Sequence, residues 1–377
     1  MQPLQRIRLC RGVRRELCMH IPHDAFDDSL EQTFLAVVVM TERAARQPGT
    51  GHQFLGAHGR ESAFGEQTAG DAFEADFGRL GLDCLLTEET AMLVNASVSS
   101  RPVTERVITL PALGLSTRVL DSGAGPIALL LHGNPDNAEE WIPVMNRLAG
   151  THRCVAPDIP GYGKSPEPPV SFDCSVASQV AFVDELLSAL EISEPVLLIV
   201  HDIGGVMGIA WAGAHPERLT ALLITNTVAF RDFKWFPIAR TWGAESWIGR
   251  VRARAGMYAL GAGRGALFKK AFWRQSPQLT EHDVDRITRS FALNPTAKGC
   301  TLRQFRTMTK PEFFAGFAGI LQSVTRAVPT VVLWGDQDPY VPVAYAHCFG
   351  HARVILLPTA GHWVALTEPQ RLVDEAL

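Results

Sequence analysis

The sequence predicts an α/β fold: a mostly parallel central sheet with helices on both faces and an inserted layer of helices. Continuous apolar runs such as "IALLL" and "VLLIV" indicate strands that are buried on both faces. Helical patterns separate these runs, and strands that alternate with helices favour a parallel sheet. The strand pattern is absent over residues 227–326, which predicts the insertion.

The predicted elements begin near residue 103. The alternating segments "RVITLP" and "LSTRVLD" are joined by a Gly-containing turn and predict a β-hairpin. Buried strands are expected at 126–133 and in "HRCVAP", and Ser171 or Asp173 would cap the amphipathic helix that follows. The remaining strands are expected in "PVLLIV", in "LTALLITNT", at 329–335 and at 353–358, with a helix in "GVMGIAWAGAHP" after the first of them.

The chain divides into four predicted parts. Residues 1–100 have weak periodicity, which indicates a poorly ordered extension, with Met92 as an alternative start. Residues 101–226 and 327–377 are the two parts of the α/β core, and 227–326 are a helical cap. Ligands of open α/β folds bind at the carboxyl edge of the sheet, where we expect the cap. Half of the eight tryptophans belong to it: Trp235, Trp242, Trp247 and Trp273.

Composition narrows the classes of function. The chain of 377 residues is 46% hydrophobic and 20% charged, which predicts a large buried core. The formal net charge of −4 argues against a nucleic-acid partner and against a polybasic membrane anchor. The first hundred residues contain neither a membrane-spanning apolar run nor a secretory signal pattern. The seven cysteines include no C-x-x-C pair, which argues against disulfides and zinc and favours the cytoplasm.

The motif "VHDIGG" places Asp202 where a strand meets a Gly-rich turn. It resembles the nucleophile elbow of the α/β-hydrolase superfamily, with Asp in place of Ser. Val200 replaces the usual Gly, as in the haloalkane dehalogenase branch. Four further segments resemble the family in chain order over roughly 103–377: "HGNP", "PDIPGYGKS", "WGDQDPYVP" and "AGHW".

The resemblance assigns catalytic roles to three of these residues. Asp202 would be the nucleophile, His362 the base and Asp338 the acid that orients the base. Asp336 is the less favoured candidate for the acid. Taken alone, Asp202 could equally cap the following helix, a role that suits Asp. The other motifs in their family order favour the catalytic role.

A carboxylate nucleophile selects the reaction. Asp202 is ionised at pH 7 and needs no base for attack. Attack on an ester or amide would give a mixed anhydride, whereas displacement at a saturated carbon gives an alkyl ester. His362 would then activate a water to hydrolyse that ester, and the N–H groups of Ile203 and Asn134 would hold the oxyanion. Carboxylate and water supply this chemistry, so no cofactor or metal is expected.

A halide is the favoured leaving group. In haloalkane dehalogenases the Asn of "HGNP", here Asn134, helps to hold the departing halide, and a Trp after the nucleophile is the second donor. Ile203 occupies that second position and has no side-chain donor. Trp235 or Trp242 of the cap would therefore have to donate an indole N–H in its place.

An epoxide is the alternative substrate. Epoxide hydrolases usually carry cap tyrosines that donate to the epoxide oxygen. Phe305 stands where one of them is expected, which leaves Tyr258 as the candidate donor. A ligand-binding protein of the same fold without catalysis is a further alternative. The aromatic cap predicts a small, mostly apolar substrate, and the sequence leaves the oligomeric state open.

Overall fold

The described residues form an eight-stranded sheet. The computed structural model describes residues 102–377, and the extension predicted over residues 1–100 lies outside them. The strands lie in the order β1-β2-β4-β3-β5-β6-β7-β8. Their bounds are β1 (Thr104–Leu110), β2 (Leu115–Gly123), β3 (Ile127–Leu131), β4 (Arg153–Pro157), β5 (Val196–His201), β6 (Leu219–Thr225), β7 (Thr330–Gly335) and β8 (Arg353–Leu357).

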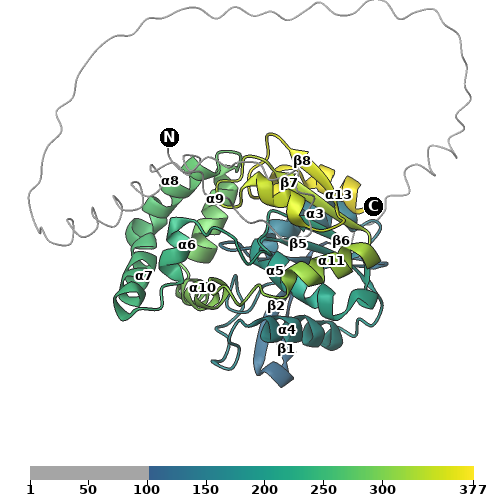
Figure 1. Ribbon diagram of the computed structural model, residues 1–377, viewed down its shortest axis with the longest axis horizontal. Coiled ribbons are helices and arrows are strands. Elements are labelled where there is room, and N and C mark those ends of the chain that lie inside the picture. The colour runs from purple at the N-terminus through teal and green to yellow at the C-terminus, as the bar shows by residue number, and fades with distance from the viewer. Residues whose placement is uncertain (1–101) are drawn as a thin grey trace, which may run out of the picture. The chain divides into compact units, whose positions relative to one another are not determined.

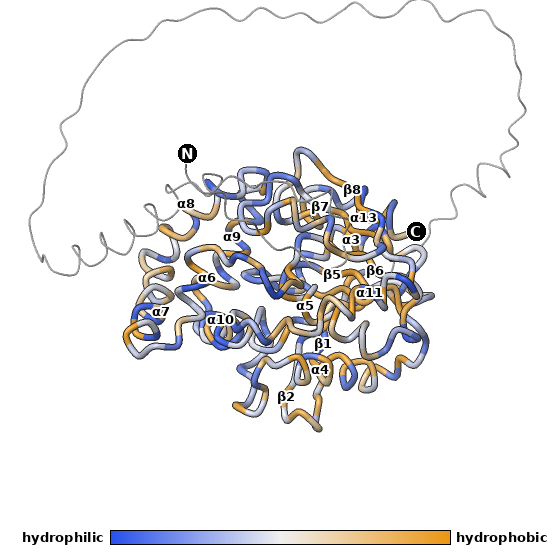
Figure 2. Tube along the Cα trace, in the orientation of Figure 1, coloured by the Kyte–Doolittle hydropathy of each residue, from blue (hydrophilic) through white to orange (hydrophobic). Residues whose placement is uncertain are grey.

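The sheet is mostly parallel, as predicted. The strands from β3 to β8 pair in parallel, whereas β2 pairs antiparallel with both β1 and β4. Each strand expected from the sequence is present. Figure 2 shows the central strands β5 and β6 in the orange of hydrophobic residues. The carboxyl ends of parallel strands share one edge, so the loops after β3, β5, β6 and β7 can meet there.

Helices cover both faces of the sheet (Figure 1). On one face α4 and α11 pack against α5, and on the other α3 packs against α13. Two clusters of buried side chains match these layers, one with Phe182 and Leu321, the other with Val144 and Leu372. The bounds of these core helices are α3 (Ile142–Leu148), α4 (Val176–Ala189), α5 (Asp202–Ala214), α11 (Phe317–Ala327), α12 (Val364–Thr367) and α13 (Pro369–Ala376).

The first long core helix, α4, begins later than the sequence predicted. Ser175, rather than Ser171 or Asp173, caps α4 by accepting a hydrogen bond from the N–H of Ser178. Cys174 has a φ of 60°, and a left-handed residue at this point prevents an earlier helix start. Asp173 instead supports the cap, because its Oδ1 accepts from the N–H of Ser175 and the hydroxyl of Ser178.

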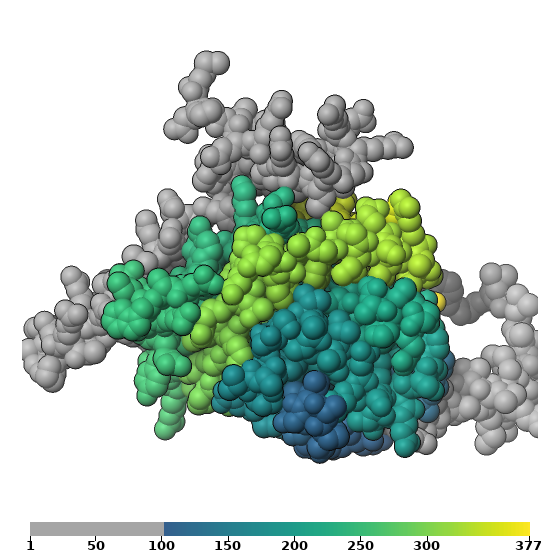
Figure 3. All heavy atoms as spheres, turned by 60° about the horizontal axis from the view of Figure 1, so that its bottom comes forward, coloured from purple at the N-terminus to yellow at the C-terminus, as the bar shows by residue number. Residues whose placement is uncertain are grey.

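Between β6 and β7 the chain forms a further layer of helices, here called the inserted helices. They are α6 (Pro237–Trp242), α7 (Trp247–Leu260), α8 (Ala266–Gln275), α9 (Glu281–Ile287) and α10 (Pro295–Met308). The next helix, α11, packs against α5 and so covers the sheet. In Figure 3 the yellow-green residues of α10 and α11 form a band beside the teal residues of the core. The boundaries at 226/227 and 326/327 stay predictions. Within 102–377 no helix is long and apolar enough to span a membrane.

A buried ion pair connects the sheet to the loop after β3. Arg118 of β2 and Asp158 after β4 are buried, and the guanidinium donates to both carboxylate oxygens at 2.6 and 2.9 Å. Arg118 also donates to the side chains of Asn137 and Glu139 in that loop. Asp158 accepts in addition from the N–H of Ala138 at 2.9 Å. The position of the loop therefore depends on this pair.

We expect Asp158→Asn to lower the free energy of unfolding by about 3 to 5 kcal/mol, because the buried guanidinium of Arg118 loses its fully buried carboxylate partner. Urea unfolding followed by tryptophan fluorescence measures the change. Arg106→Gln is the matched control, because Arg106 is 44% exposed in its ion pair with Asp121 and such pairs contribute less than about 1 kcal/mol. Equal losses in the two variants would contradict the role given to Asp158.

Candidate active site

Asp202 stands at the turn between β5 and α5. Its φ of 46° lies in the left-handed region, which costs energy for a residue other than Gly. The chain after β6 holds this conformation: the Asp202 N–H donates to the Asn226 carbonyl at 3.2 Å, and the Thr227 hydroxyl donates to the Asp202 carbonyl at 2.5 Å. Gly204 lets the turn approach β3, because a Cβ there would overlap the Leu131 carbonyl oxygen. The Asp202 carboxylate consequently projects from the edge of the sheet.

The loop after β3 binds this carboxylate. The backbone N–H of Asn134 donates to Oδ1 of Asp202 at 2.8 Å. Gly133 permits the close approach, because a Cβ there would meet the Cβ of Asp202. Ile203 lines the adjoining pocket, but within 102–377 its N–H makes no hydrogen bond to the carboxylate. Of the two expected oxyanion donors, the Asn134 N–H therefore contacts Asp202 in this structure and the Ile203 N–H does not.

His362 lies on the other side of the carboxylate. Its Nε2 is 3.7 Å from Oδ2 of Asp202, and its Nδ1 is 2.7 Å from Oδ2 of Asp338. Nδ1 therefore donates its proton to the Asp338 carboxylate, and Nε2 faces Asp202. A separation of 3.7 Å is too long for a direct hydrogen bond, so Nε2 can accept a proton from a water instead.

Asp338 is fixed by donors other than His362. Asn226 donates from Nδ2 to Oδ2 of Asp338 at 2.7 Å, and two backbone N–H groups of the following turn donate to Oδ1 at 2.7 and 3.0 Å. Asn226 was not nominated from the sequence, although its place directly after β6 is a signal for a residue of the site. Asp336, the less favoured candidate, makes no hydrogen bond to His362 in the described chain.

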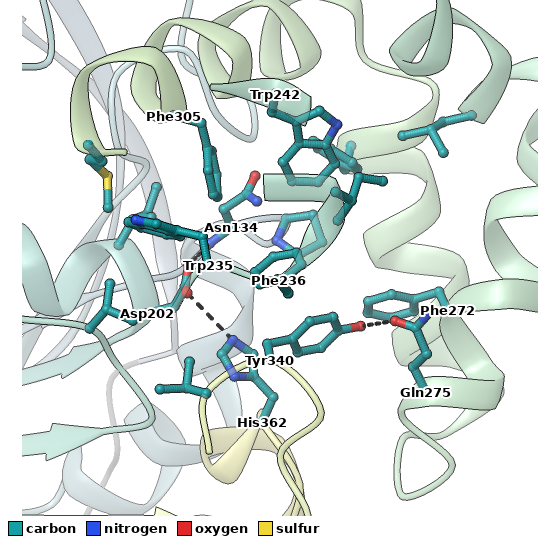
Figure 4. Close-up of a pocket in the computed structure, with 18 of the residues that line it drawn as sticks. Asn134, Asp202, Trp235, Phe236, Trp242, Phe272, Gln275, Phe305, Tyr340 and His362 are labelled. Atoms are coloured by element: carbon teal, nitrogen blue, oxygen red, sulfur yellow. Dashed lines mark hydrogen bonds and ion pairs between the residues drawn. The ribbon is translucent and has the colours of Figure 1, made fainter. Parts of the chain in front are cut away.

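A largely apolar pocket adjoins Asp202, between the edge of the sheet and the inserted helices (Figure 4). Asp202, His362 and Asn134 form its polar end. A pocket of this composition favours a substrate that is mostly apolar. Its aromatic side chains are Phe233, Trp235, Phe236, Trp242, Phe268, Phe272, Phe291, Phe305 and Tyr340.

Three of the four cap residues nominated from the sequence line this pocket: Trp235, Trp242 and Phe305. The fourth, Tyr258, does not. It lies on α7 with 85% of its surface exposed, so the prediction that it contacts substrate is wrong. Its neighbour Met257 is buried, and successive residues of a helix point about 100° apart, which turns Tyr258 to the outside.

The pocket contains another tyrosine, which the sequence analysis missed. Tyr340 comes from the loop after β7, and its hydroxyl donates to Oε1 of Gln275 on α8 at 2.9 Å (Figure 4). Burial raises the pKa of Tyr340, so the hydroxyl stays protonated at neutral pH. The spacing from Asp338 in "DPY" is the signal that could have identified it.

The inserted helices orient the side chain of Asn134. Thr301 of α10 donates its hydroxyl proton to Oδ1 of Asn134 at 2.9 Å, and Nδ2 has no partner within the described residues. Thr301 is buried, and its oxygen lies 3.2 Å from the Tyr162 hydroxyl. Two residues after Asn134, Asp136 forms a buried ion pair with Arg286 of α9. The inserted helices thus hold the loop after β3 at two points.

No second side-chain donor accompanies Nδ2 of Asn134 among the described residues of this end of the pocket. Ile203 is apolar, and it occupies the position beside Asp202. In Figure 4 the indole nitrogens of Trp235 and Trp242 lie on the sides of their rings away from the Asn134 amide. A leaving group bound here would consequently have one side-chain donor.

A second histidine–carboxylate pair lies behind the site. His201 is buried, and its Nδ1 is 3.1 and 3.3 Å from the carboxylate oxygens of Glu140, which is buried too. Its ring centroid lies 4.5 Å from that of His362. Burial acts to lower the pKa of His201, but the charge of Glu140 and the hydrogen bond to it raise the pKa to about 9. His201 is therefore a cation beside Asp202 at neutral pH.

Comparisons with known proteins agree with this geometry. Residues 126–369, more than half of the chain, match the model of a family described as alpha/beta hydrolase fold. A cis-3-alkyl-4-alkyloxetan-2-one decarboxylase of Xanthomonas campestris pv. campestris is 26% identical over 283 residues, 69% of this chain and 90% of the relative. A haloalkane dehalogenase of Agrobacterium fabrum is 34% identical over 119 residues, 32% of this chain and 38% of the relative.

A solved structure of epoxide hydrolase CorEH shares the fold. The TM-score is 0.60, the sequence identity is 21%, and the match covers 73% of this chain and 97% of that chain. A likeness at this identity shows the fold and no more. The comparisons therefore do not distinguish between these activities.

We expect the stability of the protein to fall between about pH 6.5 and 9 through the pair of His201 and Glu140. The pKa of His201 is raised from 6.5 to about 9 in the folded protein, so its contribution is complete below pH 6.5 and is lost as pH rises through 9. In Glu140→Gln the urea midpoint should be lower at pH 6.5 and should change less over this range.

The control is Glu217→Gln, at an exposed carboxylate 3.7 Å from His215. This variant should follow the wild type at every pH. A pH profile of Glu140→Gln parallel to that of the wild type would show that Glu140 does not hold the proton on His201.

Proposed function

Because the chain belongs to the α/β-hydrolase fold family, we propose that it is an enzyme whose Asp202 displaces a leaving group from a saturated carbon of a small apolar substrate. One observation carries the proposal: a carboxylate occupies the turn, with the Asn134 N–H on Oδ1 and Nε2 of His362 3.7 Å from Oδ2. A carboxylate in this place attacks without a base. Asp202 is the proposed nucleophile, His362 the base and Asp338 its orienting acid.

The two oxygens of Asp202 have different tasks in the proposed reaction. Oδ2 attacks the substrate carbon, and the bond to the leaving group breaks with its electron pair. Oδ1 becomes the carbonyl oxygen of the resulting alkyl ester. Nε2 of His362 then takes a proton from a water whose oxygen attacks the ester carbon, while the Asn134 N–H stabilises the oxyanion at Oδ1. As this intermediate collapses, the protonated Nε2 of His362 returns its proton to the departing oxygen, which frees an alcohol and restores Asp202 and His362. None of these steps uses a metal or cofactor.

The proposed substrate class is a strained oxygen ring of the oxetan-2-one type. Attack on ring carbon C4 breaks its bond to the ring oxygen and frees a carboxylate, which needs no proton because the pKa of such an acid is about 4. The single side-chain donor among the described residues at this end of the pocket, Nδ2 of Asn134, suits a carboxylate as the leaving group. An epoxide would leave as an alkoxide and need an acid, whereas the Tyr340 hydroxyl is bound to Gln275. The relative matched over 90% of its length is named as a decarboxylase of such rings.

The ring-opened ester has two possible fates. Hydrolysis through His362 gives a 3-hydroxy acid. Alternatively, the bond to the carboxylate breaks, its electron pair forms a carbon–carbon double bond, and the ester oxygen returns to Asp202 with its own pair. The second route releases carbon dioxide and an alkene without water, so the products distinguish the two routes.

A haloalkane is the second candidate substrate. The unpaired Nδ2 of Asn134 and the 34% identity to a haloalkane dehalogenase over 119 residues favour it. Ile203 disfavours a haloalkane, because it stands where a second side-chain donor to the halide is expected. Epoxide opening, and ligand binding without turnover, are the remaining alternatives.

The first experiment is trapping of the ester in His362→Gln, which should form the ester and fail to hydrolyse it. The full chain is incubated separately with a cis-3,4-dialkyloxetan-2-one, 1-bromobutane and 1,2-epoxybutane, and intact mass and peptide mapping follow. We expect the lactone to form an adduct at Asp202 whose added mass equals that of the whole lactone. If the ring-opened ester decarboxylates, we expect a cis-alkene as the product instead. An adduct that survives hydroxylamine is an alkyl ester, whereas a mixed anhydride is cleaved.

Two variants control the trapping experiment. In the background of His362→Gln, Asp202→Asn should give no adduct, and Asp336→Asn should give the same adduct as its parent. A butyl adduct alone would make haloalkanes the substrate class in place of lactones. A hydroxybutyl adduct alone would make epoxides the substrate class. No adduct at Asp202 and no product with any substrate would overturn the mechanism and favour ligand binding.

Thr301 is a positioning residue for Asn134 in this proposal. Thr301→Val removes the hydrogen bond to Oδ1 of Asn134 and should lower kcat about 10- to 100-fold with little change in KM, because the amide donor acts mainly on the developing charge. Thr301→Ser keeps the hydroxyl and should restore most of the rate. Equal rates for Thr301→Val and the wild type would contradict this role, as would an equal loss in Thr301→Ser.

A further inference from the structure

The outer face of α7 carries apolar side chains in a row. Trp247, Val251 and Tyr258 are 78%, 52% and 85% exposed. Their spacing of four and seven residues places them on one stripe of the helix. The opposite face is buried through Met257 and Leu260. Large exposed side chains in such a row indicate a surface that another apolar phase covers.

Arginines border this stripe on both sides. At about 100° per residue, Arg250 and Arg254 fall on one flank of the stripe. On the other side the exposed Ile248 widens the stripe, and Arg252 lies beyond it. None of these three arginines forms an ion pair with another residue of the described chain. Residues 247–275 contain seven basic residues and no acidic one, in a chain whose net charge is −4. Of these seven, Lys269 pairs with Glu281 and Asp285 of α9. The stripe is therefore the centre of a local cationic surface.

The nearby residue Arg306 of α10 shows the effect of these charges. Burial lowers the pKa of Arg306, and the charges of Arg250 and Arg254 lower it further. Arg306 therefore has cationic neighbours in Arg250 and Arg254, and none of these three arginines forms an ion pair among the described residues. A partner for this surface should therefore supply negative charge at the flanks of the stripe and an apolar phase at its centre.

We propose that α7 binds the surface of a membrane that contains anionic lipids. Tryptophan and tyrosine side chains suit the interface between lipid and water, and flanking arginines can extend their guanidinium groups to lipid phosphates. A helix that lies in this interface needs no membrane-spanning segment. A second copy of the chain is a poor occupant, because it would bring two sets of unpaired arginines together.

The inner face of the same helix reaches the pocket. Leu260, at the carboxyl end of α7, lines the pocket, as do Phe268 and Phe272 of α8. In Figure 1 α7 lies at the side of the inserted helices that is farthest from the sheet. A membrane at this place would hold an apolar substrate close to the pocket. The binding itself does not depend on the proposed reaction.

The test is flotation of the full chain with vesicles of phosphatidylcholine alone, or with about one third phosphatidylglycerol. The chain should float with the anionic vesicles and bind the neutral ones weakly. Together, Arg250→Gln, Arg252→Gln and Arg254→Gln should lower the partition coefficient at least about tenfold. Together, Trp247→Ser, Val251→Ser and Tyr258→Ser should have an effect of about the same size.

Matched variants at other exposed positions are the controls. Arg147→Gln, Arg231→Gln and Arg371→Gln together remove the same charge, and Val107→Ser with Val170→Ser removes exposed apolar side chains; both should float like the wild type. Asp202→Asn should also float, which separates this test from that of the reaction. Circular dichroism confirms that each variant is folded.

Two results would overturn the proposal. The first is that the wild-type chain fails to float with anionic vesicles. This includes the cases in which α7 binds a second copy of the chain or an acidic protein instead. The second is flotation of both α7 variants at the level of their controls.

Discussion

The hydrogen bond from the Asn134 N–H to Oδ1 of Asp202 is the interaction on which the site depends. The loop that supplies it, residues 132–138, is held from two further directions. Behind it, the buried carboxylate of Asp158 binds the loop to the sheet, and in front of it Arg286 and Thr301 bind it to the inserted helices. A change in any of these contacts therefore reaches the Asp202 carboxylate through one short segment of backbone.

A carboxylate at the turn changes what its surroundings must do. A serine nucleophile needs a base within hydrogen-bond reach, whereas an ionised carboxylate needs donors that stabilise its charge away from water. The Asn134 N–H and the cationic ring of His201 supply this stabilisation. In the proposed reaction His362 is then free to act on a water, and the 3.7 Å between its Nε2 and Oδ2 of Asp202 fits that task better than removal of a proton from a nucleophile.

The sheet and the placement of Asp202, Asp338 and His362 could be predicted because they follow from strands. Apolar runs identify strands, and a parallel sheet brings the segments after their carboxyl ends together. No comparable rule predicts how the inserted helices orient their side chains. Whether Tyr258 or Met257 faces inward depends on the rotation of α7 against its neighbours, and the contact between Thr301 and Asn134 joins residues 167 positions apart. Composition and local motifs carry no information about either.

The net charge of −4 does not describe the surface of α7, because it sums over positions that are far apart on the protein. Ions in solution attenuate charge interactions beyond about 10 Å at 0.1 M salt, so acidic residues elsewhere on the chain cannot neutralise the arginines of α7. The two faces of α7 suit two different environments. One face forms part of the wall of an apolar pocket, and the other carries an exposed apolar stripe between arginines. Water satisfies the arginines but not the stripe, whereas an anionic lipid surface satisfies both, and this difference is the physical basis for assigning the outer face to a membrane.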